Sequence, residues 1–210
     1  MKNKKIMKRI FFYVFLLVIA FVLAVATYML FGKIQKNKYK KILQENDATN
    51  YELTEIEDGI ENKVYVRDKI LLAENGNTKI WVNELEQKRV TYDEHYKTVI
   101  LDQNDETLKV NSLNYTYIND FFDNSSQKFK YLGSENGYHK LQFKDKNTNI
   151  ITVLYLNEKT NVIDKMVQIF GNSEHIIEFK VRKNSVSEKE VEFPNLEGYR
   201  VYDSVNSRPE

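Results

Sequence analysis

The chain has 210 residues, the length of one ordinary domain with an appended segment. Its composition is 42% hydrophobic and 13% aromatic with only 2 prolines, which supports a globular core and excludes wholesale disorder. The chain contains no cysteine, which excludes disulfides, thiolate metal sites, a cysteine nucleophile and a lipid-modified cysteine.

The formal net charge of +1 hides a segregation of the two signs. Residues 1–44 contain ten basic side chains and no acidic one, and the first acidic residue is Glu45. The later residues carry the other 21 of the 31 basic side chains and all 30 acidic ones, a formal charge of −9. An acidic domain on a basic stem argues against nucleic-acid binding. It suits a domain that is held near an anionic membrane.

Residues 10–31 (IFFYVFLLVIAFVLAVATYMLF) form 22 consecutive positions without a charge. As a helix they would extend about 33 Å, enough to cross the hydrocarbon of a bilayer. The alternatives are a buried core helix and a signal peptide, which the small residues 24–26 would allow to be cleaved before Thr27. The apolar run continues through residues 28–31, which favours a retained anchor. We expect the short basic N-terminus in the cytoplasm and the long polar part outside, or in the space between the membranes of a forespore.

The composition divides the rest of the chain into successive parts. Residues 1–9 form the basic N-terminus, residues 32–44 a basic helical stem, residues 45–203 the β-rich domain and residues 204–210 a flexible tail. Within the stem, Tyr39, Ile42 and Leu43 share one side of a helix and could dock on the domain.

The domain consists of short β-branched and aromatic runs separated by turn residues. The predicted strands are residues 62–72, 78–85, 88–92, 97–101, 106–110, 128–132, 138–144, 150–156, 162–170 and 174–182. A short helix is expected at residues 114–122. Spacings of 8–14 residues with short turns predict consecutive antiparallel strands rather than βαβ units.

Two of these strands indicate which side chains face the interior. In residues 174–182 the residues His175, Ile177, Phe179 and Val181 lie on one face and Ile176, Glu178, Lys180 and Arg182 on the other, which predicts one buried face and one wet face. The hairpin at residues 153–171 predicts a solvated turn at residues 158–161. It also places five apolar side chains on the core or cavity side: Leu154, Leu156, Ile163, Val167 and Ile169.

No catalytic signature is present in the sequence. The three histidines, His95, His139 and His175, have no metal-ligand spacing, so neither a metal nor a cofactor is expected. An unrecognised hydrolase would need one of them to meet a serine or a carboxylate in a cleft. The acidic cluster around Glu55 and Glu57 is expected by chance in a domain of this charge.

Trp81, the only tryptophan, lies in the middle of a predicted strand. It is either a core aromatic or one wall of a hydrophobic cavity, and aromatic richness alone does not separate the two.

Three segments together resemble the LolA/LppX/RseB group. Residues 76–93 (GNTKIWVNELEQKRVTYD) resemble its unit of a turn, a strand with Trp, a short turn and a strand. Residues 155–170 (YLNEKTNVIDKMVQIF) resemble its strand, D/E-K-x-T, turn and strand hairpin, and residues 180–203 resemble its closing segment.

The resemblance implies an α+β fold, mainly antiparallel β, in which a curved half-barrel sheet holds short helices in its concave face. It implies a non-enzymatic module that binds a protein partner or, alternatively, a lipid or lipoprotein in the concave cavity. One clostridial branch of the group, GerS-like germination proteins, acts with a spore-cortex amidase during sporulation and germination. Here a transmembrane span would replace the lipid anchor, which favours local binding over shuttling. Open sheet edges would also allow a homodimer.

The candidate cavity or partner surface follows from the same apolar strands. It consists of Trp81, Ile80, Val82, Tyr155, Val167, Ile169 and Phe179.

Overall fold

The computed structural model describes residues 2–103 and 109–203, and the side chains of residues 15–102 and 109–202. The predicted C-terminal tail and most of the predicted strand 106–110 lie outside the described residues, and residues 109–110 are not in a strand. The helices are α1 (Lys2–Glu45), α2 (Tyr115–Tyr117), the π-helical turn η1 (Ile118–Asp123) and the 3₁₀ turn η2 (Glu188–Val191). The first strands are β1 (Asn50–Glu57), β2 (Ile60–Arg67), β3 (Ile70–Asn75), β4 (Thr78–Asn83), β5 (Lys88–Asp93) and β6 (Thr98–Gln103). The later strands are β7 (Gln127–Glu135), β8 (Tyr138–Asp145), β9 (Ile151–Asn157), β10 (Ile163–Phe170), β11 (Ser173–Lys183) and β12 (Arg200–Asp203).

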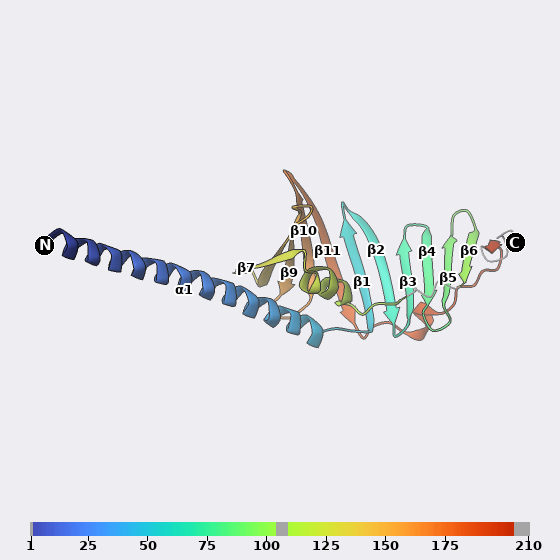
Figure 1. Ribbon diagram of the computed structural model, residues 1–210. Coiled ribbons are helices and arrows are strands. Elements are labelled where there is room, and N and C mark those ends of the chain that lie inside the picture. The colour runs from blue at the N-terminus through green and yellow to red at the C-terminus, as the bar shows by residue number, and fades with distance from the viewer. Residues whose placement is uncertain (1, 104–108, 204–210) are drawn as a thin grey trace.

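All twelve strands form one open sheet in the order β12-β6-β5-β4-β3-β2-β1-β11-β10-β9-β8-β7. Neighbouring strands are antiparallel, except that β12 pairs in parallel with β6. Two meanders, β1–β6 and β7–β11, are joined where β1 pairs with β11 (Figure 1). The predicted fold class, mainly antiparallel β with short helices and one apolar N-terminal helix, is confirmed.

Short turns with left-handed residues set the register of the hairpins. In the β1–β2 turn Asp58 and Gly59 both have positive φ, 50° and 80°, and Asn136 and Gly137 do the same between β7 and β8. Two successive positive φ angles match the right-handed twist of the flanking strands, which is why Asp-Gly and Asn-Gly favour two-residue hairpins.

Helix α1 runs unbroken from the apolar segment into the domain. Most of it stands clear of the sheet, and only its C-terminal part lies against the strands (Figure 1). Its apolar part is long enough to cross a membrane, with a mean hydropathy of 2.5 and none of that window buried. The stem docks as predicted, because Tyr39 and Leu43 are fully buried.

One face of the sheet, called here the helix face, carries α1, α2 and η1. Its main core cluster packs Tyr39, Leu43 and Phe122 against strands β8–β11. The strand residues of that cluster are Leu141, Phe143, Leu154, Leu156, Ile163, Ile177 and Phe179. A second cluster on the same face places Val110 and Leu113 over β1–β4. The helix predicted at residues 114–122 is confirmed as α2 and η1.

A polar junction fastens the end of α1 to the helix face. Asp47 accepts hydrogen bonds from the Ser112 hydroxyl and from the backbone N–H of Asn114, the latter at 2.7 Å. The buried Asn114 amide in turn donates to the Leu43 carbonyl at 2.9 Å. These contacts satisfy backbone groups that a helix end leaves without intrahelical partners.

The opposite face, called here the tail face, is covered by a described segment at the β2–β6 end. There the segment 186–199 packs on a third core cluster formed by Trp81, Val90, Tyr92 and Val99. Leu196 and Tyr199 of that segment lie against the same cluster. The apolar side of the sheet therefore changes from the helix face to the tail face along its length.

Three predictions of strand extent or phase were wrong. Residues 62–72 form the β2–β3 hairpin rather than one strand, and β1 has no counterpart among the predicted strands. The register of β10 against β9 shifts between Ile163 and Lys165, so the phase of the strand changes there. As a result Ile163 faces the helices, whereas Val167 and Ile169 face the opposite side, because a bulge inserts one residue into the alternation.

Replacing Leu43 with Ala tests how much the docked stem contributes to stability. Leu43 is fully buried, so Leu43→Ala should lower the free energy of unfolding by about 2–5 kcal/mol. Urea unfolding of the full chain in detergent micelles, followed by the fluorescence of Trp81, measures this. The neighbouring exposed Gln44→Ala is the control and should change stability by less than about 0.5 kcal/mol. Equal stability of the two variants would show that the stem does not pack on the sheet.

Candidate functional site

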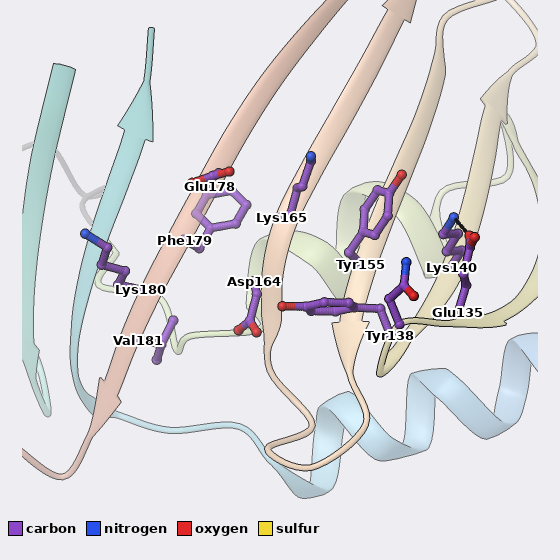
Figure 2. Close-up of a pocket in the computed structure, with 11 residues that line it drawn as sticks. Glu135, Tyr138, Lys140, Tyr155, Asp164, Lys165, Glu178, Phe179, Lys180 and Val181 are labelled. Carbon is purple, nitrogen blue, oxygen red and sulfur yellow. Dashed lines mark hydrogen bonds and ion pairs between the residues drawn. The ribbon is translucent and has the colours of Figure 1, made fainter. Parts of the chain in front are cut away.

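A row of charged and aromatic side chains crosses the tail face of β8–β11 (Figure 2). Lys140, Tyr155, Lys165 and Glu178 are direct cross-strand neighbours, one from each strand. Lys140 and Lys165 flank the Tyr155 ring, with each Nζ atom 5.6 Å and 5.5 Å from its centroid. Cations at this distance from an aromatic face are attracted to it, so the two lysines hold the ring in place.

Tyr138 joins these four residues. The region formed by Tyr138, Lys140, Tyr155, Lys165 and Glu178 is called here the Tyr155 surface. Tyr138 packs edge-on against Tyr155 with ring centroids 6.2 Å apart. A hydrogen-bonded ion pair with Glu135 raises the pKa of Lys140 and lowers the pKa of Glu135, so both stay charged at neutral pH. The residues enclose a shallow pocket of about 620 Å³ on the outside of the sheet.

An apolar strip lies beside the Tyr155 surface on the same face. The next cross-strand row contains Val153, Val167 and Ile176, and the row after it pairs Ile151 with Ile169. Ile176 is 41% exposed, whereas Val153 and Val167 are each 7% exposed. The described helices that pack on β7–β11 do so through side chains of the helix face, so no helix covers this strip within the described residues. Aromatic and cationic groups thus meet on this face beside an apolar strip of which Ile176 is the most exposed member.

The helix face, in contrast, is largely filled by the chain itself. Tyr39, Leu43, Phe121 and Phe122 occupy the space over β8–β11. What remains is a pocket of about 330 Å³ between α2, η1 and the sheet, lined partly by Tyr51, Glu55 and Tyr117.

Burial shapes the ionisation of the groups in that pocket. Desolvation, followed by the nearby charge of Glu57, raises the pKa of Glu55. Desolvation likewise raises the pKa of Tyr51 to about 12 and raises the pKa of Tyr117, so both phenols stay neutral.

Trp81 is a core residue beneath the C-terminal segment rather than the wall of an open cavity on the helix face. Its Nε1 donates a 2.8 Å hydrogen bond to the Val191 carbonyl, and Phe193 packs edge-on against its ring at 5.1 Å. A shallow pocket of about 660 Å³ reaches its edge, and its rim includes the 2.8 Å ion pair between Arg67 and Glu188.

The seven residues of the predicted surface lie on both sides of the sheet. Ile80, Val82 and Phe179 belong to the core clusters or their packing on the helix face. Trp81, Tyr155, Val167 and Ile169 point to the tail face, and among these only Tyr155, Val167 and Ile169 are close neighbours. Lys140, Lys165 and Glu178 were missed by the sequence reasoning, because only the strand register brings them beside Tyr155.

The histidines do not form a catalytic arrangement. Ser134 Oγ lies 2.6 Å from His139 Nδ1, and Glu158 Oε1 lies 3.5 Å from the same nitrogen. A catalytic triad needs the nucleophile and the carboxylate on opposite ring nitrogens, which this geometry does not provide. His175 pairs with Glu57 at 2.9 Å, and His95 lies in an exposed turn. Among the residues that the structure describes, no three His, Asp or Glu side chains are grouped to hold a metal ion.

Comparison with known proteins identifies the fold but no family. No family model matches the chain, and no curated protein matches it. The crystal structure of an uncharacterized conserved protein from Thermus thermophilus matches with a TM-score of 0.51 and 10% identity, over 80% of this chain and 98% of that one. The complex of Pseudomonas aeruginosa MucA/MucB gives a TM-score of 0.42 and 9% identity, over 76% of this chain and 61% of that one. At such identities the likeness to the Thermus protein concerns the fold alone.

Replacing Glu55 with Gln tests the electrostatics of the helix-face pocket. Because the pKa of Glu55 is raised in the folded state, its contribution to stability is complete below about pH 4.3, the ordinary value for an unfolded glutamate, and is lost as the pH rises through the folded pKa. Glu55→Gln should therefore be more stable than the parent at neutral pH and equal to it at about pH 4. Urea unfolding of the full chain across this pH range measures the difference.

The matched control for this experiment is Glu174→Gln, which changes an exposed glutamate on β11. It should follow the pH profile of the parent. If Glu55→Gln also follows the parent profile, its carboxyl is solvated in the folded protein.

Proposed function

We propose that this chain is a membrane-anchored, non-enzymatic binding or adaptor module that contacts a protein partner through the Tyr155 surface. The observation that carries the proposal is the combination of the half-buried Tyr138 and Tyr155 with paired charges and the exposed Ile176 on a face that no described helix covers. Aromatic anchors surrounded by polar groups are typical of the energetic centres of protein interfaces. The anchor would hold this surface close to the membrane. We propose that the domain lies on the extracytoplasmic side.

A protein partner is favoured over a lipid in the concave cavity. On the helix face, Tyr39, Leu43, Phe121 and Phe122 fill the space that a carried acyl chain would occupy. The remaining pocket of about 330 Å³ is at the lower end of the size of small-molecule sites and contains the carboxyl of Glu55. Binding of a lipid or lipoprotein there remains the alternative.

The most specific form of the proposal is a GerS-like partner of a spore-cortex amidase within a LolA/LppX/RseB-like group. The place of the three resembling segments in the sheet supports the wider group rather than this branch of it. They coincide with the β4–β5 hairpin, the β9–β10 hairpin, and the stretch from the end of β11 to β12. An open antiparallel sheet with short helices on one face also agrees with the half-barrel that the resemblance implies.

Site-specific crosslinking tests whether the Tyr155 surface meets a protein. The full chain with p-benzoylphenylalanine in place of Tyr155, expressed in its native cells, should form a crosslink to one envelope protein on illumination. Tyr155→Ala should weaken binding of the identified partner at least about 30-fold, the equivalent of about 2 kcal/mol for an interface anchor. The affinity is measured with the purified full chain and the captured partner.

Tyr96 is the matched control, because it is 72% exposed in the β5–β6 turn, far along the sheet order from β9. The same crosslinker at Tyr96 should capture no such partner, and Tyr96→Ala should bind normally. Identification of a cell-wall or cortex amidase would support the GerS-like form. Equal capture from both positions would contradict the proposed surface.

Membrane extraction tests the anchor. Because residues 10–31 carry no charge and α1 continues through them, the full-length chain should remain in the membrane pellet after alkaline carbonate treatment. Intact-mass analysis should show the N-terminal segment still present. A chain that begins at Thr27 and appears in the soluble fraction would instead establish a cleaved signal peptide.

A further inference from the structure

A second surface feature lies where α1 leaves its apolar segment and meets the edge strand β7. A groove of about 500 Å³ runs between residues 28–36 of the helix and residues 127–131 of the strand. The uncharged run ends at Phe31, and Lys33 is the first charged residue after it. In an anchored chain, a groove at this height opens at the boundary between hydrocarbon and headgroups.

The polar side of the groove is basic. Lys33 and Lys36 line it from the helix. Lys128 and Lys130 border it from β7, where they alternate with Phe129 and therefore point to the tail face. Within the described part of the chain, none of these four lysines has a carboxylate oxygen within 4.0 Å. The nearest acidic group that acts on Lys36, Asp123, already pairs with Lys40.

Two further lysines, Lys40 and Lys146, lie near Lys36 and add positive charge around it. Burial lowers its pKa most, Asp123 opposes that change, and the positive charges of Lys40 and Lys146 lower the pKa further. An anion placed beside Lys36 would relieve its repulsion with Lys40 and Lys146.

The other side of the groove is apolar and aromatic. Tyr28, Met29 and Phe31 are 68%, 69% and 52% exposed on the last turns of the apolar segment, and Phe129 faces them from β7. Aromatic residues at this depth sit at the interface of a bilayer, and Met adapts to flexible acyl chains. The groove therefore joins an acyl-compatible wall to a basic rim.

We propose that this groove binds one anionic phospholipid from the leaflet on the domain's side. Lys33 and Lys36 hold the headgroup phosphate, and the first part of an acyl chain lies along Met29 and Phe31. Lys128 and Lys130, on the tail face of the edge strand, add positive potential beside the headgroup. The bound lipid covers the outer edge of β7, which is otherwise open to strand pairing, and holds the sheet against the membrane. The inference rests on the retained anchor of the proposed function and is independent of the Tyr155 surface.

Native mass spectrometry of the full chain, released from detergent micelles, tests this with phosphatidylglycerol and phosphatidylcholine of identical acyl chains. The chain should bind one phosphatidylglycerol at least about tenfold more tightly than phosphatidylcholine, the equivalent of about 1.4 kcal/mol. The variant Lys33→Gln/Lys36→Gln/Lys128→Gln/Lys130→Gln should lose this preference. All four lysines line or border the groove and lack a carboxylate partner in the described part of the chain, and an unchanged urea midpoint would confirm that the variant folds.

The control removes four positive charges from the other half of the sheet and its cover: Lys63→Gln/Lys69→Gln/Lys97→Gln/Lys189→Gln. It should keep the preference for phosphatidylglycerol, because these lysines lie on β2, η2 and turns away from α1. Equal binding of the two lipids by the parent would overturn the proposal. So would a retained preference in the groove variant, or an equal loss in both variants, since net charge alone would then explain binding. A chain that leaves the membrane after carbonate treatment would refute the anchor instead, so the two failures are distinguishable.

Discussion

A sheet of twelve strands has two faces, and this chain has only short segments with which to cover them. How these few covering segments are placed determines which parts of each face are buried. The docked end of α1, with α2 and η1, covers the helix face over β7–β11 and β1, and the segment 186–199 covers the tail face over β3–β6. Tyr39 and Leu43 of α1 pack on the β8–β11 half of the sheet. Val191 and Phe193 pack on Trp81 in the β3–β6 half. The second cluster, with Val110 and Leu113, also covers the helix face over β1–β4. The Tyr155 surface lies opposite the main core cluster, on a face of β8–β11 that no described helix covers.

Alternation along the sequence predicted the parts of the fold in which one face is buried and the phase is unbroken. Strand β11, with Ile177 and Phe179 inward, is the clearest case. Strand β1 escaped prediction because it carries glutamates on both faces. Glu52 is buried beside Arg182 on one side and Glu55 lies in the helix-face pocket on the other, so its hydrophobic pattern is weak. The bulge after Ile163 could not be anticipated either, because a bulge changes which residues share a face without changing the composition.

The candidate site was partly predictable for a related reason. Tyr155, Val167 and Ile169 were expected on a functional surface, and the structure brings them together on the tail face. Their charged neighbours come from three other strands and are separated from Tyr155 by up to 23 positions in the sequence. Only the pairing register aligns Lys140, Lys165 and Glu178 with it. Trp81 attracted attention as the only tryptophan, yet its indole N–H is satisfied by a backbone carbonyl under the tail, as a buried core tryptophan requires.

The continuous helix α1 bears on both the proposed partner surface and the proposed lipid site, because it connects the apolar segment to the sheet. Residues 33–45 extend the apolar segment without a break, and the Asp47–Asn114 junction with the buried Leu43 fixes the end of that helix to the sheet. A flexible linker would let the domain sample many orientations, whereas a helix with a docked end restricts them. An anchored domain of this kind cannot exchange cargo between distant membranes. In the proposed anchored state, the proposed partner therefore comes to the Tyr155 surface near the bilayer, where the proposed headgroup between α1 and β7 would fix the remaining rotation of the sheet.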